Sequence, residues 1–272
     1  DVQQSFTCDV VFSVIHGQQG EDGVVQGLLN CLQLPFVGSD VLGSSICMAK
    51  HVAKALLHQA GIQTAPGVVV TPETCSEYTY ENLQQQFGST LFIKPSASGS
   101  SIGVSRVSDA VAYANALTIA FKYDHHVLVE QAIVGREIEC SVLGNTQCAV
   151  SLPGEIIIKE GFYDYAAKYV EEDTAVVQTP ADLPQELISN IQALAKQVFI
   201  ALQCKGLARI DIFVTELGEI FVNEVNTMPG FTDISMYAKN WQASGIDVED
   251  LLSRLIELAC DDFSCKQQKY QA

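Results

Sequence analysis

Polar residues occur at alternate positions in two apolar stretches near the C-terminal end of the chain. In the stretch RIDIFVTELGEIFVNEVN they are Arg209 and Asp211, followed by Glu224 and Asn226. Successive side chains of a β-strand point to opposite faces, so each pair shares one face of a predicted strand. If the strands form a hairpin that reverses symmetrically at the Leu-Gly pair between them, Asp211 faces Glu224 and Arg209 faces Asn226. A slip of one residue would turn one pair to the other face.

Hydrophobic periodicity along the rest of the chain predicts strands that alternate with helices, as in an α/β protein with α+β lobes. We expect a partial N-terminal α/β lobe over residues 1–40, a central lobe over 41–134 and a C-terminal lobe over 135–272. The apolar runs DVVFSVIHG and LPFVG predict two strands of the first lobe. Two short strands and one helix are too little to cover a sheet, so we expect an earlier segment of this lobe to lie outside these 272 residues.

Helix signals and turn signals divide the other two lobes. We expect one helix from Ser44, as its cap, to Gly61, one capped by Ser108, and one from Pro184 to about Gln203. The stretch REIECSVLGNTQCAVSLP predicts a hairpin that turns at its Gly-Asn pair, and DVEDLLSRLIELA predicts the last helix.

Composition narrows the class of protein. Hydrophobic residues make up 48% and charged residues 17% of the 272 residues, and no apolar run reaches the roughly 18 residues of a membrane helix. This predicts a soluble, cytoplasmic protein without a membrane partner. The formal net charge of −17 argues against a nucleic-acid partner, which would need clustered Lys and Arg. The nine cysteines are odd in number and never spaced C-x-x-C, so we expect them to be reduced and mostly buried.

The predicted hairpin places Asp211, Glu224 and Asn226 side by side. Their oxygens are hard ligands that suit Mg²⁺, which completes its coordination with water and phosphate oxygens. The alternative is an ordinary face held by ion pairs with Arg209. Two carboxylates opposite each other repel without a counter-ion, which favours the metal.

A loop of small residues follows Lys94 in the stretch FIKPSASGSSIGVS. Gly and Ser allow backbone N–H groups to surround a phosphate, and Lys supplies a point charge. A plain hairpin loop remains an alternative, because the stretch matches neither a P-loop nor G-x-G-x-x-G. Taken by themselves, Lys50 and Lys168 are better explained as lysines that reach solvent.

Three further residues are candidates for a ligand site. Glu130 and Glu137 flank QAIVGR, where two carboxylates could accept hydrogen bonds from ribose hydroxyls, although exposed carboxylates are the alternative. His16 precedes a glycine and is equally well explained as a loop histidine.

Seven motifs occur in order along nearly the whole chain, from about Asp9 to the last helix. They are IHG…GEDG, CMAK, FIKP…GSSIGVS, VEQAIVGREIE, FYDYAAKY, RIDIF and NEVNTMPGFTDIS. In this order they resemble the D-alanine–D-alanine ligases of the ATP-grasp superfamily. The resemblance implies three lobes, with ATP bound between the central and C-terminal lobes.

The resemblance also implies roles for individual residues. ATP would be bound by Lys50, Lys94, Ser101, Glu130, Gln131, Ile133, Glu137, Phe162, Lys168 and Asn223. Two Mg²⁺ or Mn²⁺ ions would be held by Asp211, Glu224 and Asn226. Catalytic residues would be Arg209, Ser100, Tyr169 and Lys168, and the substrate D-alanines would be bound by His16, Gly230 and Ser235.

The activity implied is ligation of two D-alanines by way of an acyl phosphate, giving ADP and phosphate, for peptidoglycan precursors. A homodimer is implied as well. Two departures from the family pattern are Ala49, where an Asp often precedes the Lys of CMAK, and the family's first β-α unit, for which we find no counterpart. Alternatives are a chain that binds nucleotide without catalysis, or a ligase whose acceptor is D-lactate or D-serine. Tyr169 after Lys168 resembles the members that make the D-alanine dipeptide.

Overall fold

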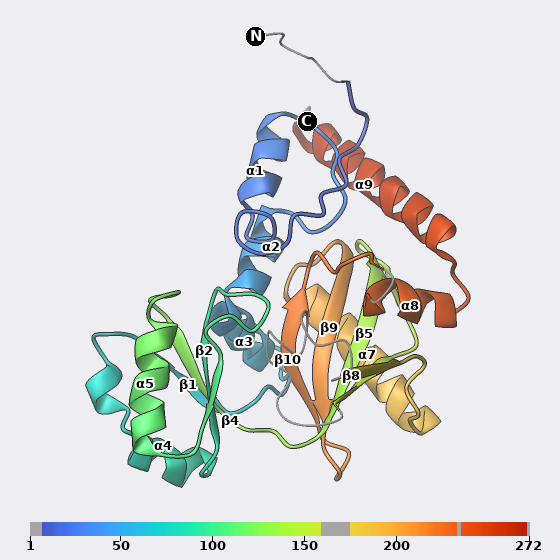
Figure 1. The fold of residues 1–272 in the computed structure, drawn as a ribbon. Helices are drawn as coiled ribbons and strands as arrows, with labels where there is room; N and C mark the ends of the chain where they lie inside the picture. Colours follow the sequence, from blue (N-terminus) through green and yellow to red (C-terminus); the bar gives the residue numbers. More distant parts are fainter. Residues whose placement is uncertain (1–6, 159–174, 233–234, 271–272) are drawn as a thin grey trace.

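Two antiparallel β-sheets organise the protein, as the computed structural model shows for residues 7–158, 175–232 and 235–270 (Figure 1). The smaller sheet has four strands in the order β1-β4-β2-β3. Its strands are β1 (Gly67–Val70), β2 (Leu91–Pro95), β3 (Ser105–Val107) and β4 (Val127–Gln131). Helices α4 (Tyr80–Phe87) and α5 (Ala110–Ala120) cover one face, where Leu83 and Leu117 join the core of this lobe. A 3₁₀ turn, η1 (Cys75–Glu77), precedes α4.

The larger sheet has six strands, in the order β10-β9-β5-β7-β8 with β6 paired to β5. They are β5 (Arg136–Gly144), β6 (Cys148–Val150), β7 (Gly154–Ile158), β8 (Ala175–Gln178), β9 (Gly206–Val214) and β10 (Ile220–Asn226). Helix α7 (Gln185–Ala201) packs on one face, and α8 (Met236–Ala243) lies against the other with α9 (Val248–Tyr270). The sequence patterns had not indicated β7, β8 or α8.

The N-terminal segment contains α1 (Val24–Cys31), α2 (Val41–Met48) and α3 (Lys50–Gln59). The prediction of two strands in this segment is wrong. Its described residues form only an isolated parallel bridge between Val11 and Phe36. Both predicted strand segments are apolar, but no residue pairs next to this bridge continue it into a ladder among the described residues.

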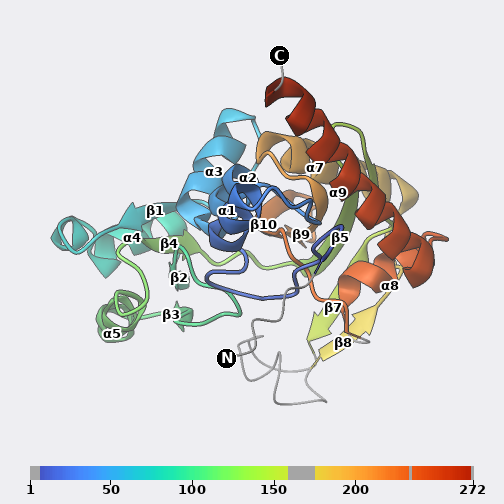
Figure 2. The ribbon, with the colours of Figure 1, turned by 90° about the horizontal axis from the view of Figure 1, so that it is seen from above.

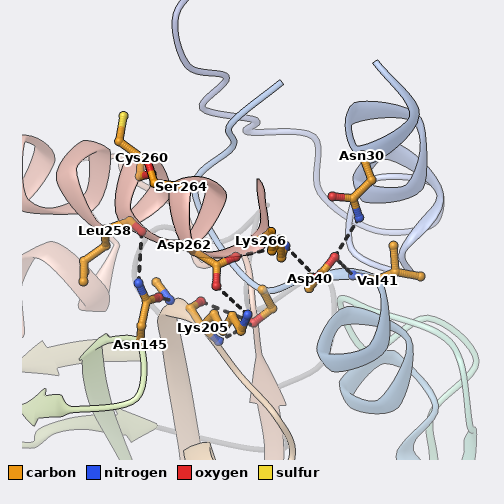
Figure 3. Close-up of polar contacts among 12 residues, drawn as sticks. Asn30, Asp40, Val41, Asn145, Lys205, Leu258, Cys260, Asp262, Ser264 and Lys266 are labelled. Carbon is orange, nitrogen blue, oxygen red and sulfur yellow. Dashed lines mark hydrogen bonds and ion pairs between the residues drawn. The ribbon is translucent and has the colours of Figure 1, made fainter. Parts of the chain in front are cut away.

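The last helix crosses to this N-terminal segment, as Figures 1 and 2 both show. Lys266 Nζ lies 2.6 Å from Asp40 Oδ2 and 2.9 Å from Asp262 Oδ2 (Figure 3). Lys205, just before β9, lies 2.5 Å from the other oxygen of Asp262. These ion pairs tie α9 to both the larger sheet and the start of α2.

The helix expected from Ser44 to Gly61 is two helices, so that prediction is wrong. Asp40 caps α2, since its side chain accepts a hydrogen bond from the N–H of Val41. The chain then breaks at Ala49, whose φ of −85° and ψ of 84° are not helical. Periodicity could not reveal the break, because apolar residues continue across it.

Helix α3 has no capping side chain of its own. Instead the N–H of His51 donates to Ser96 Oγ at 3.1 Å, and the N–H of Lys50 donates to Ser96 O. The first residue of the glycine-serine loop (residues 96–103) therefore accepts the hydrogen bonds of the first turn of α3. A smaller correction concerns α5, which is capped by Asp109 and not by Ser108.

The predicted pairing of β9 with β10 is confirmed at the site residues. Asp211 lies opposite Glu224, and Arg209 lies opposite Asn226. Between the turn and Asn223, however, the two strands pair one residue out of the expected register. A β-bulge at Asn223 then restores the expected pairing. Bulges of this kind place two residues of one strand against one of the other.

The cysteines are free, as expected, but most are not buried. Only Cys47, Cys140 and Cys204 are buried, whereas four are exposed: Cys8, Cys31, Cys260 and Cys265. Cys47 and Cys204 touch at 3.6 Å between sulfur atoms, inside the core beneath the larger sheet.

Candidate active site

A pocket of about 320 Å³ opens between the N-terminal segment, the glycine-serine loop and the larger sheet. It brings together eight of the residues expected at the site: His16, Lys50, Ser100, Arg209, Glu224, Asn226, Gly230 and Ser235. A second hollow of about 40 Å³ shares Glu139, Ile156 and Glu224 with it. This second hollow adds three more expected residues: Glu137, Asp211 and Asn223.

Arg209 is the central cation of the larger sheet. Its Nε and Nη2 each donate a hydrogen bond of 2.7 Å to Asp211, which lies two residues along the same face of β9. Glu139 of β5, opposite Asp211 in the ladder, also lies 3.0 Å from Arg209 Nε. Burial would lower the pKa of Arg209, but Asp211 and Glu139 hold it above the ordinary value. The guanidinium therefore stays charged at the base of the pocket.

Lys50 is the first residue of α3 and points into the same pocket. Its Nζ donates to Ser98 O at 2.7 Å and lies 3.3 Å from Glu224 Oε2. Its side chain is only 11% exposed, so the interpretation as a solvated lysine is wrong. Lys50 thus joins the glycine-serine loop to β10.

The glycine-serine loop has an unusual backbone between β2 and β3. Ser100 and Ser101 have φ of 52° and 57°, in the left-handed region that side chains other than glycine rarely adopt. Asp124 accepts a hydrogen bond of 2.6 Å from the N–H of Ala97, and His51 and Ser96 contact each other at 2.6 Å. Strained residues on a well-anchored loop are typical of a ligand site.

Lys94, near the end of β2, reaches from the smaller sheet to the larger one. Its Nζ donates to Asn223 Oδ1 at 3.2 Å and lies 2.6 Å from Glu130 Oε2. Glu130 is only 2% exposed and is shared with Lys54 of α3, so its interpretation as an exposed carboxylate is wrong. Burial would raise the pKa of Glu130, but the two lysines hold it below its ordinary value.

Gln131 and Ile133 lie at the end of β4 and just beyond it, and both are half-buried. The N–H of Gln131 donates to Pro66 O at 2.8 Å, which fixes the chain that leaves the smaller sheet. Phe162, Lys168 and Tyr169 lie outside the described residues.

The other end of the pocket holds His16, Gly230 and Ser235. A Cβ built on Gly230 would lie 2.8 Å from Ser235 Oγ and 4.0 Å from His16 Nε2, so a side chain at position 230 would displace the Ser235 hydroxyl. His16 Nδ1 lies 3.4 Å from Glu21 Oε1. Burial raises the pKa of Glu21, although hydrogen bonds with Gly17 and His16 oppose the shift.

Sequence reasoning missed three residues of the site region: Glu21, Lys54 and Glu139. Glu139 could have been found, because it shares the face of Glu137 by the alternation already used for β9. Glu21 lies inside the quoted GEDG motif. Lys54 follows Lys50 by four residues, one helical turn along, but no local signal shows that it is buried.

The donor set of Asp211, Glu224 and Asn226 suits a hard cation, because it consists of two carboxylates and an amide oxygen. Among the described residues, however, no group of three or more His, Cys, Asp and Glu side chains is placed to hold a metal ion. Arg209 and Lys50 now lie beside the two carboxylates. The chemistry of the donors fits Mg²⁺.

Two antiparallel sheets, with Lys94 of β2 and Lys50 of α3 directed toward carboxylate and amide groups of β10, define the ATP-grasp class of enzyme. Comparisons with known proteins narrow the class to a family. Residues 56–257 match the family model described as the D-ala D-ala ligase C-terminus, and residues 1–39 match that of the D-ala D-ala ligase N-terminus. The chain belongs to the D-alanine–D-alanine ligase family, as its motifs had indicated.

Individual relatives agree with this assignment. A D-alanine–D-alanine ligase of Shouchella clausii is 50% identical over 253 residues, which are 93% of this chain and 69% of the relative. The structure of the D-alanine–D-alanine ligase from Coxiella burnetii matches with a TM-score of 0.88 at 39% identity, over 98% of this chain and 73% of that one. The VanG D-Ala:D-Ser ligase from Enterococcus faecalis matches with a TM-score of 0.86 at 36% identity, over 94% and 74%.

Within the described residues, none of the helices combines the length and the apolar character that crossing a membrane requires.

Proposed function

We propose that this protein joins two molecules of D-alanine, with ATP as the energy source, to give D-alanyl-D-alanine, ADP and phosphate. The observation that carries the proposal is the convergence of Lys50, Ser100, Arg209 and Glu224 on one pocket in a chain of this family. The product would serve peptidoglycan precursor synthesis in the cytoplasm.

The nucleotide would lie between the two sheets. Lys50 and Lys94 are the cations for its phosphates, because both project from the smaller-sheet side toward carboxylates or amides of β10. Gln131 and Ile133, with Glu130, would line the adenine edge, and Glu137 would hold the ribose. Ser101 and Asn223 complete the set proposed among the described residues, and Phe162 and Lys168 are proposed by resemblance alone.

Two Mg²⁺ or Mn²⁺ ions would be held by Asp211, Glu224 and Asn226. Bound there, they would neutralise charge on the transferring phosphoryl group and orient it for transfer. Lys50, now 3.3 Å from Glu224, would then be available to a phosphate oxygen.

The residues of the pocket suggest how the chain would guide the reaction. Arg209, Gly230 and Ser235 would hold the carboxyl group of the first D-alanine, which accepts the γ-phosphoryl group to form an acyl phosphate. The amine of the second D-alanine then attacks the acyl carbon, and phosphate leaves. Arg209 stabilises the oxyanion that develops at this carbon, because a fixed guanidinium needs no reorganisation during the step. His16 would lie near the first D-alanine, and Ser100 and Tyr169 near the second.

A second candidate keeps the chemistry and changes the acceptor to D-serine or D-lactate. The likeness to the VanG D-Ala:D-Ser ligase supports D-serine as a competitor. Tyr169 supports D-alanine by resemblance. Mass spectrometry of the products formed from equal concentrations of D-alanine, D-serine and D-lactate separates the three.

We also propose that the protein forms a homodimer through its N-terminal lobe. Val24 and Leu28 of α1, with Leu32 directly after the helix, form an exposed apolar stripe, in which each residue is more than half exposed. Sedimentation velocity of the protein and of Leu28→Glu tests the proposal; a monomer at micromolar concentration would contradict it.

The activity is tested by phosphate release from Mg-ATP with D-alanine, with L-alanine and without an amino acid. Release that requires D-alanine is expected. ATP binding without such release would instead favour a chain that binds nucleotide but does not catalyse ligation.

A further inference from the structure

Three charged side chains meet in the interior between α3 and the smaller sheet. Glu130 of β4 lies between Lys54 of α3 and Lys94 of β2, with one carboxylate oxygen paired to each lysine. Lys54 also donates to Ala65 O at 3.2 Å. All three side chains are at least nine-tenths buried. Helix α3 packs Ala53 and Leu57 into the core of the larger sheet. The adjacent face of the helix, which carries Lys54, is therefore directed toward the smaller sheet.

The group has two positive charges and one negative charge. A buried charge that lacks a partner is costly, so an excess ammonium group favours the arrival of an anion. Lys94 is the member that faces the gap between the sheets, because it alone also contacts Asn223 of β10. Under the proposed function this anion is a nucleotide phosphate, and Lys94 must leave Glu130 at least in part to meet it.

That movement would strand the carboxylate of Glu130 unless a second cation remained. We propose that Lys54 is a positioning residue for nucleotide binding, which holds Glu130 so that Lys94 can turn to a phosphate. Lys54 itself does not touch the nucleotide. The inference rests on the proposed function, since it takes Lys94 as a phosphate ligand.

The inference predicts that nucleotide binding depends on pH through the protonation of Lys54. The charged groups that face Lys54 are Glu130 from β4 and Lys94 from β2. Burial lowers the pKa of Lys54 to about 8, although Glu130 opposes the shift. Lys54 is therefore charged at pH 7 and largely neutral at pH 9.5. In the neutral state Glu130 depends on Lys94, so phosphate binding should weaken as the pH rises through about 8.

The experiment is calorimetric titration of the whole chain with ADP and, separately, with adenosine, at pH 7 and pH 9.5. Lys54→Met removes the charge, and Lys54→Arg keeps it at both pH values because guanidinium does not deprotonate in this range. Lys122→Met, at an exposed lysine near the smaller sheet, is the matched control.

At pH 7, Lys54→Met should bind ADP about tenfold or more weakly than the wild type, as expected when one partner of a buried charge pair is removed. Its binding of adenosine, which has no phosphate, should weaken by a smaller factor, because adenosine would meet Glu130 at the adenine edge but needs no movement of Lys94; retained adenosine binding also shows that the site is folded. The wild type and Lys122→Met should lose ADP affinity between pH 7 and pH 9.5. Lys54→Arg should not show this loss.

Two results would overturn the inference while leaving the proposed function intact. One is ADP binding by Lys54→Met that equals the wild type, and the other is an equal loss of ADP and adenosine binding, which indicates a purely structural role. If the wild-type chain bound adenosine but not ADP, or neither, the proposed function itself would fail and the inference with it.

Discussion

Arg209 and Asp211 form a two-pronged ion pair between residues that are two positions apart on one strand, with both hydrogen bonds 2.7 Å long. Strand alternation alone puts them on one face, and the strand then fixes the plane of the guanidinium relative to the pocket. The position of this cation is thus set by two adjacent strands, since Asp211 of β9 and Glu139 of β5 both contact its guanidinium.

Replacement of Arg209 by lysine should therefore lower kcat/KM for D-alanine by about a hundredfold. An ammonium group keeps the charge but cannot make both hydrogen bonds or present a planar donor to an oxyanion. The measurement is ADP formation at saturating Mg-ATP. Arg254→Lys, in an exposed pair with Asp250 on α9, is the control and should behave as the wild type. Activity of Arg209→Lys within twofold of the wild type would remove Arg209 from the catalytic set.

Glu224→Gln should abolish ADP formation and raise the Mg²⁺ concentration needed for ATP binding. The change keeps the shape of the side chain but removes a charged ligand from the proposed metal site. ATP binding measured over a series of Mg²⁺ concentrations tests this directly. Asp211→Asn should act similarly, although it also removes the partner of Arg209.

The matched control for these changes is Glu216→Gln in the exposed turn of the same hairpin. It should leave both turnover and Mg²⁺ dependence unchanged. Near-normal turnover in Glu224→Gln would count against a metal at this position.

Gly103→Ala should destabilise the glycine-serine loop by about 1 to 2 kcal/mol. Gly103 has a φ of 75°, and a Cβ there would lie 2.8 Å from both Pro95 and Tyr123. Gly99→Ala is the control in the same loop, because a Cβ at Gly99 would meet nothing within 4 Å. Thermal unfolding of the two variants compares them, and equal midpoints would show that the loop adapts freely.

Alkylation of the cysteines should occur in two groups. Cys8, Cys31, Cys260 and Cys265 are exposed and should react with iodoacetamide in the folded protein. Cys47 and Cys140 should react only on unfolding, because burial raises the pKa of Cys140 to about 12, and contact with Cys204 together with burial raises that of Cys47. Peptide mass spectrometry with and without denaturant distinguishes the groups, and early labelling of Cys140 would contradict the burial seen here.

Asp40→Asn should lower the free energy of unfolding at pH 7 by about 1 kcal/mol, because asparagine still caps α2 but loses the ion pair with Lys266. Burial alone would raise the pKa of Asp40, yet hydrogen bonds from Lys266 and Asn30 hold it below its ordinary value. A lowered folded-state pKa means that the charge contributes stability above the ordinary pKa of about 4. That contribution is lost as the pH falls through the folded-state value.

Urea unfolding of wild type and Asp40→Asn between pH 7 and pH 3 should therefore show a difference that shrinks at the acid end. Asp109→Asn, the same change at the cap of α5, is the control and should have a smaller effect. A difference that grows toward low pH would reverse the sign of the argument.

The sequence predicted that Asp211 and Glu224 share a face, because alternation is a local property of the chain, whereas the bulge at Asn223 that brings them opposite each other was not indicated. The sequence was also sufficient to relate Lys50, Lys94 and the glycine-serine loop to one family, because the order of these motifs along the chain matches that family. Neither argument required knowledge of how the lobes pack.

What could not be predicted depends on contacts between distant segments. Lys54 and Glu130 are 76 residues apart in the sequence, and they become partners only because α3 packs against the smaller sheet. The break at Ala49 is similar, since the first turn of α3 is completed by Ser96, which follows β2. Local patterns describe each element but not the partner that ends it.

The bulge at Asn223 determines how the hairpin tolerates changes in length. Since the turn over residues 215–219 lies on the far side of the bulge, whole-residue insertions at the exposed Leu217 add to the loop without altering which residues face the pocket. Deletion of Asn223 would likewise keep Glu224 opposite Asp211, because it removes only the extra residue of the bulge. Deletion of Val225 is a different event, because it would turn Asn226 to the opposite face while leaving Arg209 and Asp211 in place. Deletion scanning along this hairpin should accordingly preserve the pairing of the carboxylates when Asn223 is lost and disrupt the shared face when Val225 is lost.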